Sequence, residues 1–271
     1  MTRSPPQPDT CLMCLLIFAH RANPEYPLVV AANRDEFHAR PTAPSAFWAE
    51  SPDLLAGRDL QAGGTWMGLT RGGRFAAVTN YRDPSRTHPA PRSRGELPLD
   101  FLAGRADPAD YLAEVAGIAG EYAGFNLLLG DRHSLWYLTN SPSEEQASPV
   151  ELSPGIYGLS NAQLDTPWPK VELGKRKLRD LLETAVLDHD SLLEVVSDRQ
   201  LADSDALHRQ GMADGMDRML SAQFIVTGSY GTRSSTSLWT DRRGHAHWRE
   251  RSFNARGDVL GEREERLRLT G

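Results

Sequence analysis

The chain has 271 residues, 39% of them hydrophobic and 24% charged, with a formal net charge of −6 at neutral pH. A chain of this length can bury a full hydrophobic core in one large domain or two small ones. Its negative net charge, with arginines scattered along the chain, argues against a nucleic-acid-binding surface. No apolar run reaches the ~20 residues of a membrane span and the start lacks the apolar centre of a signal peptide, so we expect a cytoplasmic protein.

Residues 1–12 are polar and rich in proline, and they show no hydrophobic period. Such a segment cannot offset its ordering entropy by burial. We expect either a disordered leader or a wrongly assigned start, with translation beginning at Met13. The two alternatives differ chemically, because a leader that stays in place turns the α-nitrogen of Cys14 into an amide, which cannot act as a base.

Cys14 follows Met13 directly and precedes a run of apolar, strand-forming residues. If Met13 is the first residue and is removed, Cys14 carries a thiol and a free α-amine, which together are a nucleophile with its own base. An α-amine has a pKa of about 7.7–8.0 and can accept the thiol proton directly or through one water. Cys14 is therefore the candidate nucleophile. The alternative is an ordinary core cysteine, since free cysteine is among the most buried residue types.

Two patterns that suggest a metal or redox site are weak. Cys11 and Cys14 are spaced as C-x-x-C, but the chain has 2 cysteines, so no second pair completes a zinc site, and no helix pattern follows. His245 and His247 share one face of a predicted strand, with no third ligand nearby. We predict no metal site and no required cofactor.

The first two strands are expected over residues 14–20 and 27–33, joined by a polar turn. Four polar residues, Asn33, Arg34, Asp35 and Glu36, follow the second strand. A hairpin returns the end of its second strand to the start of its first, so Arg34 or Asp35 could lie close to Cys14. The alternative is an ordinary solvated turn over residues 33–36.

Gly72-Gly73 predicts a tight hairpin between two strand-like runs, the second of which ends at Asn80. The side-chain amide of Asn80 could donate to a developing oxyanion, or it could simply cap the strand. Gly63-Gly64 fits neither phosphate-binding glycine motif, so we expect a turn or a close backbone approach there. Residues 81–94 form a surface loop of the kind that covers active sites.

The remaining pattern predicts helices over 97–104, 108–122, 171–186 and 190–197, strands over 125–129, 135–139, 156–161, 222–227, 234–240 and 245–251, and no clear preference over 201–213. Strands and helices do not alternate regularly. This arrangement favours an α+β fold of antiparallel sheets covered by helices, a four-layer αββα sandwich, as a single domain over residues 13–271.

Seven ordered blocks of this chain resemble the NRDE family, also called the transport and Golgi organisation protein 2 family. The blocks are Met13-Cys14, Asn33-Arg34-Asp35-Glu36, residues 63–68, Thr79-Asn80-Tyr81-Arg82, residues 124–127, residues 158–161 with 164–170, and residues 230–236. The family is grouped with the N-terminal nucleophile hydrolases, and it is similar to the choloylglycine and penicillin V acylase branch. The resemblance implies the αββα fold.

The resemblance also implies roles for individual residues. Cys14 would be the nucleophile and Asp35 the carboxylate that holds its amine or thiol. Asn80 would be the oxyanion asparagine, and Asn161 would orient the α-amine of the nucleophile.

Three further positions are expected to contact the substrate: Arg34, Arg233 and Tyr81. The acylase branch carries an arginine just ahead of its Asn-x-Asp strand end. That position is Ala32 here, so Arg34 would be a displaced substitute for it.

Two functions stay open at this level. The first is hydrolysis of an amide or thioester bond in a small acyl compound that is not a peptide. The second is non-catalytic binding and trafficking of haem or of acyl-CoA and lipid, to which relatives in the family are linked. A cysteine thiolate can ligate haem iron. Because no C-x-x-C-H motif is present, haem would be held without a covalent bond.

Overall fold

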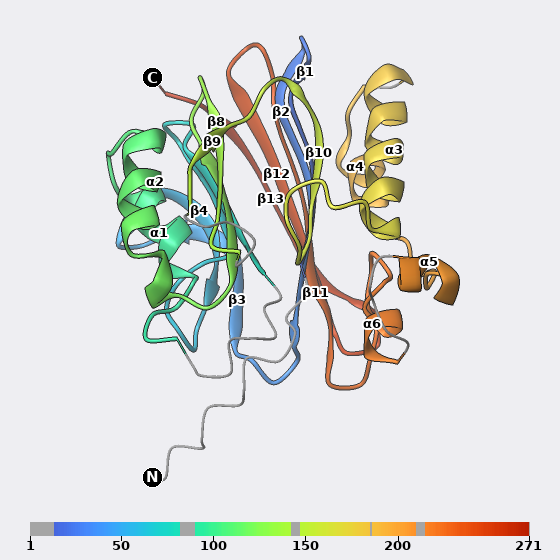
Figure 1. Cartoon of the computed structure of the whole chain (residues 1–271). Coiled ribbons are helices and arrows are strands. Elements are labelled where there is room, and N and C mark those ends of the chain that lie inside the picture. Colours follow the sequence, from blue (N-terminus) through green and yellow to red (C-terminus); the bar gives the residue numbers. More distant parts are fainter. Residues whose placement is uncertain (1–13, 82–89, 142–146, 185, 210–214, 271) are drawn as a thin grey trace.

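The computed structural model describes residues 14–81, 90–141, 147–184, 186–209 and 215–270. Two sheets face each other, and helices cover their outer faces, with α1 and α2 on one side and α3 and α4 on the other (Figure 1). The strand pairs in both sheets are antiparallel. The expected α+β sandwich of four layers, αββα, is confirmed.

The six-stranded sheet has the order β10-β1-β2-β11-β12-β13. Its strands are β1 (Cys14–Asn23), β2 (Tyr26–Phe37), β10 (Gly155–Leu159), β11 (Tyr230–Thr240), β12 (His245–Phe253) and β13 (Val259–Arg268). The seven-stranded sheet follows chain order, with β3 (Thr42–Trp48), β4 (Ser51–Asp59), β5 (Met67–Thr70), β6 (Phe75–Asn80), β7 (Phe125–Gly130), β8 (Leu135–Thr139) and β9 (Val150–Glu151).

The helices lie on the outer faces and begin where the sequence offers a start signal. They are α1 (Glu96–Ala103), α2 (Pro108–Gly117), the 3-10 helix η1 (Ala119–Glu121), α3 (Pro169–Thr184), α4 (His189–Glu194), α5 (Ser204–Arg209) and α6 (Met216–Met219). Pro108 occupies the first turn of α2, where a missing N–H costs nothing. Asp188 caps α4 by accepting from the N–H groups of Asp190 and Ser191.

Strand β1 separates two hydrophobic cores because its side chains alternate between the two faces of the sheet. Leu15 and Ile17 pack toward α3 and α4, whereas Leu16 and Phe18 pack between the two sheets. A further core lies between the seven-stranded sheet and helices α1 and α2. Cys14 and Leu16 are two residues apart on the strand, so the Cys14 side chain points to the same face as Leu16, the one between the two sheets.

The hairpin predicted at Gly72-Gly73 joins β5 to β6, and Gly73 takes a φ of +82° there. Gly64 makes the close approach expected of it, because an added Cβ would lie 2.4 Å from the backbone of Gly95. None of the helices in the described ranges is long and apolar enough to cross a membrane.

Several expected elements differ in the structure. Residues 33–36 are not a solvated turn, because β2 continues through them to Phe37 and all four are buried. Residues 222–227 form no strand beyond an isolated bridge between Val226 and Gly231. Ile225 packs in the core under the helices, whereas Phe224 packs edge-on against Phe253. Strand β13 was not expected, since it is exposed along nearly its whole length and carries little apolar patterning.

Candidate functional site

Cys14 opens β1 and lies opposite Arg34 of β2 in the strand register. Its main-chain nitrogen donates a hydrogen bond of 3.3 Å to Oδ1 of Asn161, and its carbonyl accepts one of 2.8 Å from Oγ of Ser160. The start of the strand is therefore tied by both main-chain groups to the turn that follows β10.

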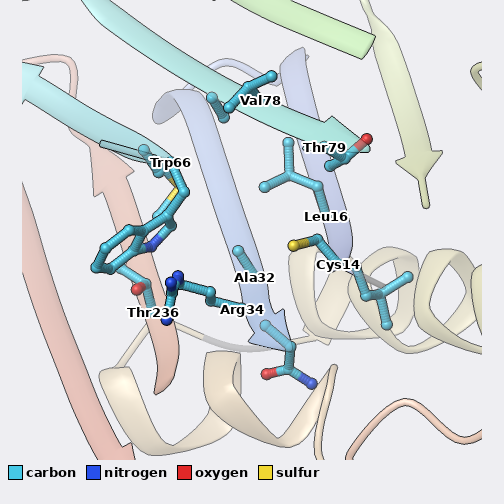
Figure 2. A pocket seen from close by; sticks show the side chains of 12 residues that line it. Cys14, Leu16, Ala32, Arg34, Trp66, Val78, Thr79 and Thr236 are labelled. Atoms are coloured by element: carbon cyan, nitrogen blue, oxygen red, sulfur yellow. The ribbon is translucent and has the colours of Figure 1, made fainter. Parts of the chain in front are cut away.

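A pocket of about 280 Å³, part of it open to solvent, lies beside Cys14 between the two sheets. Figure 2 shows the Cys14 sulfur pointing into this space, with Arg34 and Trp66 on the opposite side. The lining residues are Cys14, Leu15, Leu16, Ala32, Asn33, Arg34, Trp66, Met67, Ala77, Val78, Thr79 and Thr236. The thiol thus faces a small, largely apolar chamber with one cationic side chain.

Asn161 joins the two sheets next to the nucleophile. Its Nδ2 donates to the main-chain carbonyl of Asn80 over 2.8 Å, and its Oδ1 accepts from Oγ of Ser160 over 3.1 Å as well as from Cys14. The two asparagines singled out in the sequence are therefore adjacent at Cys14. Asn161 contacts the main-chain carbonyl of Asn80, at the end of β6.

Asn126 supports this turn from the seven-stranded sheet. The residue is completely buried, and its Nδ2 donates to the carbonyl of Ala162 over 3.0 Å and to Oγ1 of Thr79 over 3.2 Å. Thr79 in turn donates to the carbonyl of Ser160 over 2.7 Å, and Tyr137 donates to Oδ1 of Asn126 over 2.7 Å. A continuous buried network thus runs from β8 to the residue next to Asn161.

The Asp35 carboxyl lies on the opposite face of the six-stranded sheet from the Cys14 side chain, because Asp35 follows Arg34 by one residue. Its Oδ1 accepts from Thr232 over 2.6 Å, and its Oδ2 has no hydrogen-bond partner. Burial raises the pKa of Asp35 to about 7, against the opposing influence of Lys170 and Thr232. The group of Asp35 that donates to the Cys14 sulfur is its main-chain N–H, and the carboxyl points away.

The Cys14 thiol is held in its protonated form. Burial raises the pKa of this thiol to about 12, and the negative charge of Asp35 adds to the increase. The Asp35 N–H and the positive charge of Arg34 act in the other direction. In a chain that still carries the preceding residues, Cys14 is therefore a weak nucleophile at neutral pH.

Arg34 lies over the Trp66 ring, with its guanidinium carbon 4.4 Å from the ring centroid. Its Nη2 is 3.5 Å from Oε2 of Glu36, while its Nη1 is buried without a hydrogen-bond partner. The side chain lines the pocket, as its predicted role in binding substrate requires.

Arg233 and Tyr81, the other two predicted substrate contacts, do not line the pocket. Nη1 of Arg233 donates to the carbonyls of Phe37, His38 and Arg40 and so holds the turn after β2. The Tyr81 N–H bonds to the carbonyl of Gly124 over 2.8 Å. The proposed covering loop largely coincides with residues 82–89, which lie outside the described residues, as does Cys11.

His245 and His247 both face Asp241, at 3.3 and 3.5 Å. Among the described residues there is no group of three or more histidine, cysteine, aspartate or glutamate side chains placed to hold a metal ion.

The sequence matches the family described as Transport and Golgi organisation 2 over residues 13–255. The chain belongs to this family. The Transport and Golgi organization protein 2 homolog of Homo sapiens is 37% identical over 263 residues, covering 89% of this chain and 93% of its own. The homolog of Mus musculus is 36% identical over 262 residues, with the same coverage.

Among solved structures, the N-acylethanolamine-hydrolyzing acid amidase ortholog of Caenorhabditis elegans shows a distant likeness. Its TM-score is 0.45 and its sequence identity 10%, covering 68% of this chain and 86% of its own.

The blocks that mark membership of the Transport and Golgi organisation 2 family meet around Cys14. Trp66, Thr79 and Thr236 line the pocket, while Asn126 and Asn161 hold the turn beside it. The sequence patterns assigned no individual role to Trp66, Thr79 or Asn126. The one sequence signal for these three residues was that they lie inside the blocks that resemble the family.

Lys170 is a second residue that sequence reasoning passed over. It lies in the first turn of α3, is buried, and donates from Nζ to the carbonyl of Leu220 over 3.1 Å. Its charge lowers the pKa of Asp35. Its place in the block of residues 164–170 was the sequence signal for it, since a lysine at the start of a helix shows no local pattern that separates a buried position from an exposed one.

Proposed function

We propose that this protein, once residues 1–13 are removed, is a thiol hydrolase that cleaves an amide or thioester bond in a small acyl compound. The observation that carries the proposal is the position of Cys14. Its α-nitrogen has a hydrogen-bond acceptor in Asn161, while its sulfur faces a pocket between the sheets. Once residues 1–13 are removed, the α-nitrogen of Cys14 becomes a free amine. This amine would take the proton of the thiol on the same residue.

The reaction follows from these groups. The α-amine takes the thiol proton, and the sulfur attacks the acyl carbon to form a tetrahedral oxyanion. The oxyanion collapses, the bond to the leaving amine or thiol breaks, and the leaving group takes the proton from the α-ammonium. Water then attacks the thioester of Cys14 and releases the acid. We assign the oxyanion contact to the Asn80 amide, a donor type typically worth about 3–4 kcal/mol of barrier.

Removal of the preceding residues acts as the switch in this proposal. In the uncleaved chain the α-nitrogen is an amide, and burial keeps the thiol protonated with a pKa of about 12. After cleavage the α-amine can accept that proton. The uncleaved chain should therefore be nearly inert toward acyl donors.

The test compares two preparations, one that starts at Met1 and one expressed from Met13, with the first residue of each checked by intact mass. Each is mixed with p-nitrophenyl butyrate, and the butyryl adduct and p-nitrophenol are followed over time. We expect adduct and turnover only when Cys14 is first, and neither in its Cys14→Ala variant. Equal turnover in the Cys14→Ala variant, or no adduct on a confirmed N-terminal Cys14, would overturn the proposal.

A second function, non-catalytic binding of haem or of an acyl-CoA or lipid, needs no free α-amine and is therefore open to the uncleaved chain. The Cys14 sulfur points into the pocket, and a cysteine ligates haem iron in its thiolate form. Titration with haem, followed by absorption, separates this function from the first. A spectral change in the wild type that is lost in Cys14→Ala supports it, and identical spectra for the two proteins contradict it.

A further inference from the structure

The pocket beside Cys14 has one cationic end, formed by Arg34 on the Trp66 ring. Arg34 is 7% exposed, and its Nη1 is buried without a hydrogen-bond partner. A buried polar atom without a partner is rare in proteins and calls for an explanation. A guanidinium has five N–H donors in a fixed plane, which matches the two oxygens of a carboxylate.

The neighbouring acidic groups do not fully occupy Arg34. Glu36 lies 3.5 Å from Arg34 and 3.6 Å from Arg40, so its charge is shared between two cations. Arg40 is bound more closely to Asp59, at 2.6 Å. Two further buried carboxyls, Asp35 and Glu250, interact with the charge of Arg34. Glu250 accepts from the Ser45 N–H through Oε1 and leaves Oε2 without a partner.

We propose that Arg34 binds a carboxylate, and that the acyl group transferred to Cys14 is a short chain ending in that carboxylate. This inference rests on the proposed function and specifies its substrate class. Arg34 lies over the Trp66 ring, and its Nη1, which has no hydrogen-bond partner, is the position for one further anion.

The length of the acyl group follows from the strand register. Cys14 and Arg34 are direct cross-strand partners, and the Cβ atoms of such pairs lie about 4.5–5.5 Å apart. Between them the pocket walls are apolar side chains, including Leu16, Ala32 and Met67. A chain of a few carbon atoms therefore spans from the sulfur to the guanidinium.

The test uses the succinyl and butyryl thioesters of N-acetylcysteamine, which have four-carbon acyl groups with and without a terminal carboxylate. In the reaction with Cys14, a new sulfur–acyl bond forms, the old thioester bond breaks, and N-acetylcysteamine leaves with the proton. The protein with Cys14 as its first residue is mixed with each probe, and acylation is followed by intact mass after subtraction of protein-free hydrolysis.

We expect Cys14 to be acylated about 10- to 100-fold faster by the succinyl probe, the range expected for one charged hydrogen-bonded contact. In Arg34→Gln this ratio should fall to about one. Arg58→Gln is the matched control, since Arg58 also lies over a tryptophan ring, that of Trp48, pairs with Glu50 and does not line the pocket, and its ratio should stay as in the wild type. A wild-type ratio of one or below, or a ratio unchanged in Arg34→Gln, would overturn the inference.

A binding measurement in Cys14→Ala keeps Arg34 in place and needs no chemistry. Calorimetric titration with succinate and with its neutral analogue succinamide should show binding of succinate alone, weakened by added salt. If neither thioester acylates a confirmed N-terminal Cys14, the proposed function fails, and succinate binding still decides the carboxylate site. Binding of both compounds, or of neither, rules that site out.

Discussion

The main-chain nitrogen of Cys14 and Oδ1 of Asn161 are 3.3 Å apart, although 147 positions separate the two residues in the chain. Asn161 also donates to the carbonyl of Asn80, so one side chain joins the start of β1 to the end of β6. The Cys14 nitrogen, which would become the α-amine of a processed protein, therefore already has a hydrogen-bond acceptor in Asn161. The bond from Asn161 to Asn80 holds that acceptor in place.

Replacing Asn161 by Ala should release the α-nitrogen of Cys14. We expect a loss of about 1–3 kcal/mol in the free energy of unfolding, because a buried acceptor at Asn80 loses its donor. We also expect at least a tenfold slower alkylation of N-terminal Cys14 by iodoacetamide. Ser160→Ala is the matched control, since it removes the bonds from Oγ to the Cys14 carbonyl and to Asn161 Oδ1 but leaves Asn161 as the acceptor of the Cys14 nitrogen. Equal alkylation rates in Asn161→Ala and the wild type would contradict the assigned role.

The buried Asp35 should make stability depend on pH. Burial raises the pKa of Asp35 from 3.8 to about 7 in the folded chain. Between these values the folded protein holds a proton that the unfolded chain has released, so stability falls as pH rises from about 4 to about 7. The loss amounts to about 4 kcal/mol at most, at 1.36 kcal/mol per pKa unit.

Asp35→Asn tests this, because its amide oxygen can still accept from Thr232. Urea unfolding from pH 4 to pH 8 should show similar stabilities at pH 4 and a more stable variant at pH 8. A wild type that gains stability over the variant as pH rises would show that Asp35 is charged and paired in the folded protein.

Asn126→Leu should disrupt the network below the Ser160 turn. The leucine has a similar size, but it removes the acceptor of the Tyr137 hydroxyl and the Asn126 donor to the Ala162 carbonyl. We expect a loss of about 3 kcal/mol or more, since each buried unpaired group costs about 1–3 kcal/mol. Tyr137→Phe removes a single hydroxyl and should cost about 1 kcal/mol. Comparable losses in the two variants would show that Asn126 is not the centre of the network.

Gly174 allows α3 to lie close against β1. An added Cβ would be 2.6 Å from Cγ1 of the buried Ile17, so Gly174→Ala should cost about 1–3 kcal/mol through overpacking. Gly117, at the end of α2, meets nothing within 4 Å, and Gly117→Ala should gain about 0.5 kcal/mol. Thermal unfolding of the two variants should move in opposite directions, and a stabilised Gly174→Ala would contradict the packing described.

Local patterns accounted for much of the fold. The apolar runs over residues 14–20 and 27–33 predicted the β1–β2 hairpin, and the hairpin placed Arg34 beside Cys14. The helical spacing after Val171 predicted α3. Strands β3 and β13 were not expected, because an edge strand with polar or exposed faces shows too little alternation to separate it from a loop.

The sequence by itself determined where a nucleophile could stand, the strand on which it lies, and the family to which the chain belongs. Only the tertiary structure decided that residues 33–36 stay buried within β2, that Trp66 lies under Arg34, and that the Asp35 carboxyl faces away from the thiol. The physical reason is that these contacts depend on how the two sheets and α3 pack together. Residues far apart in the chain meet there, and no local period records which of them will be neighbours.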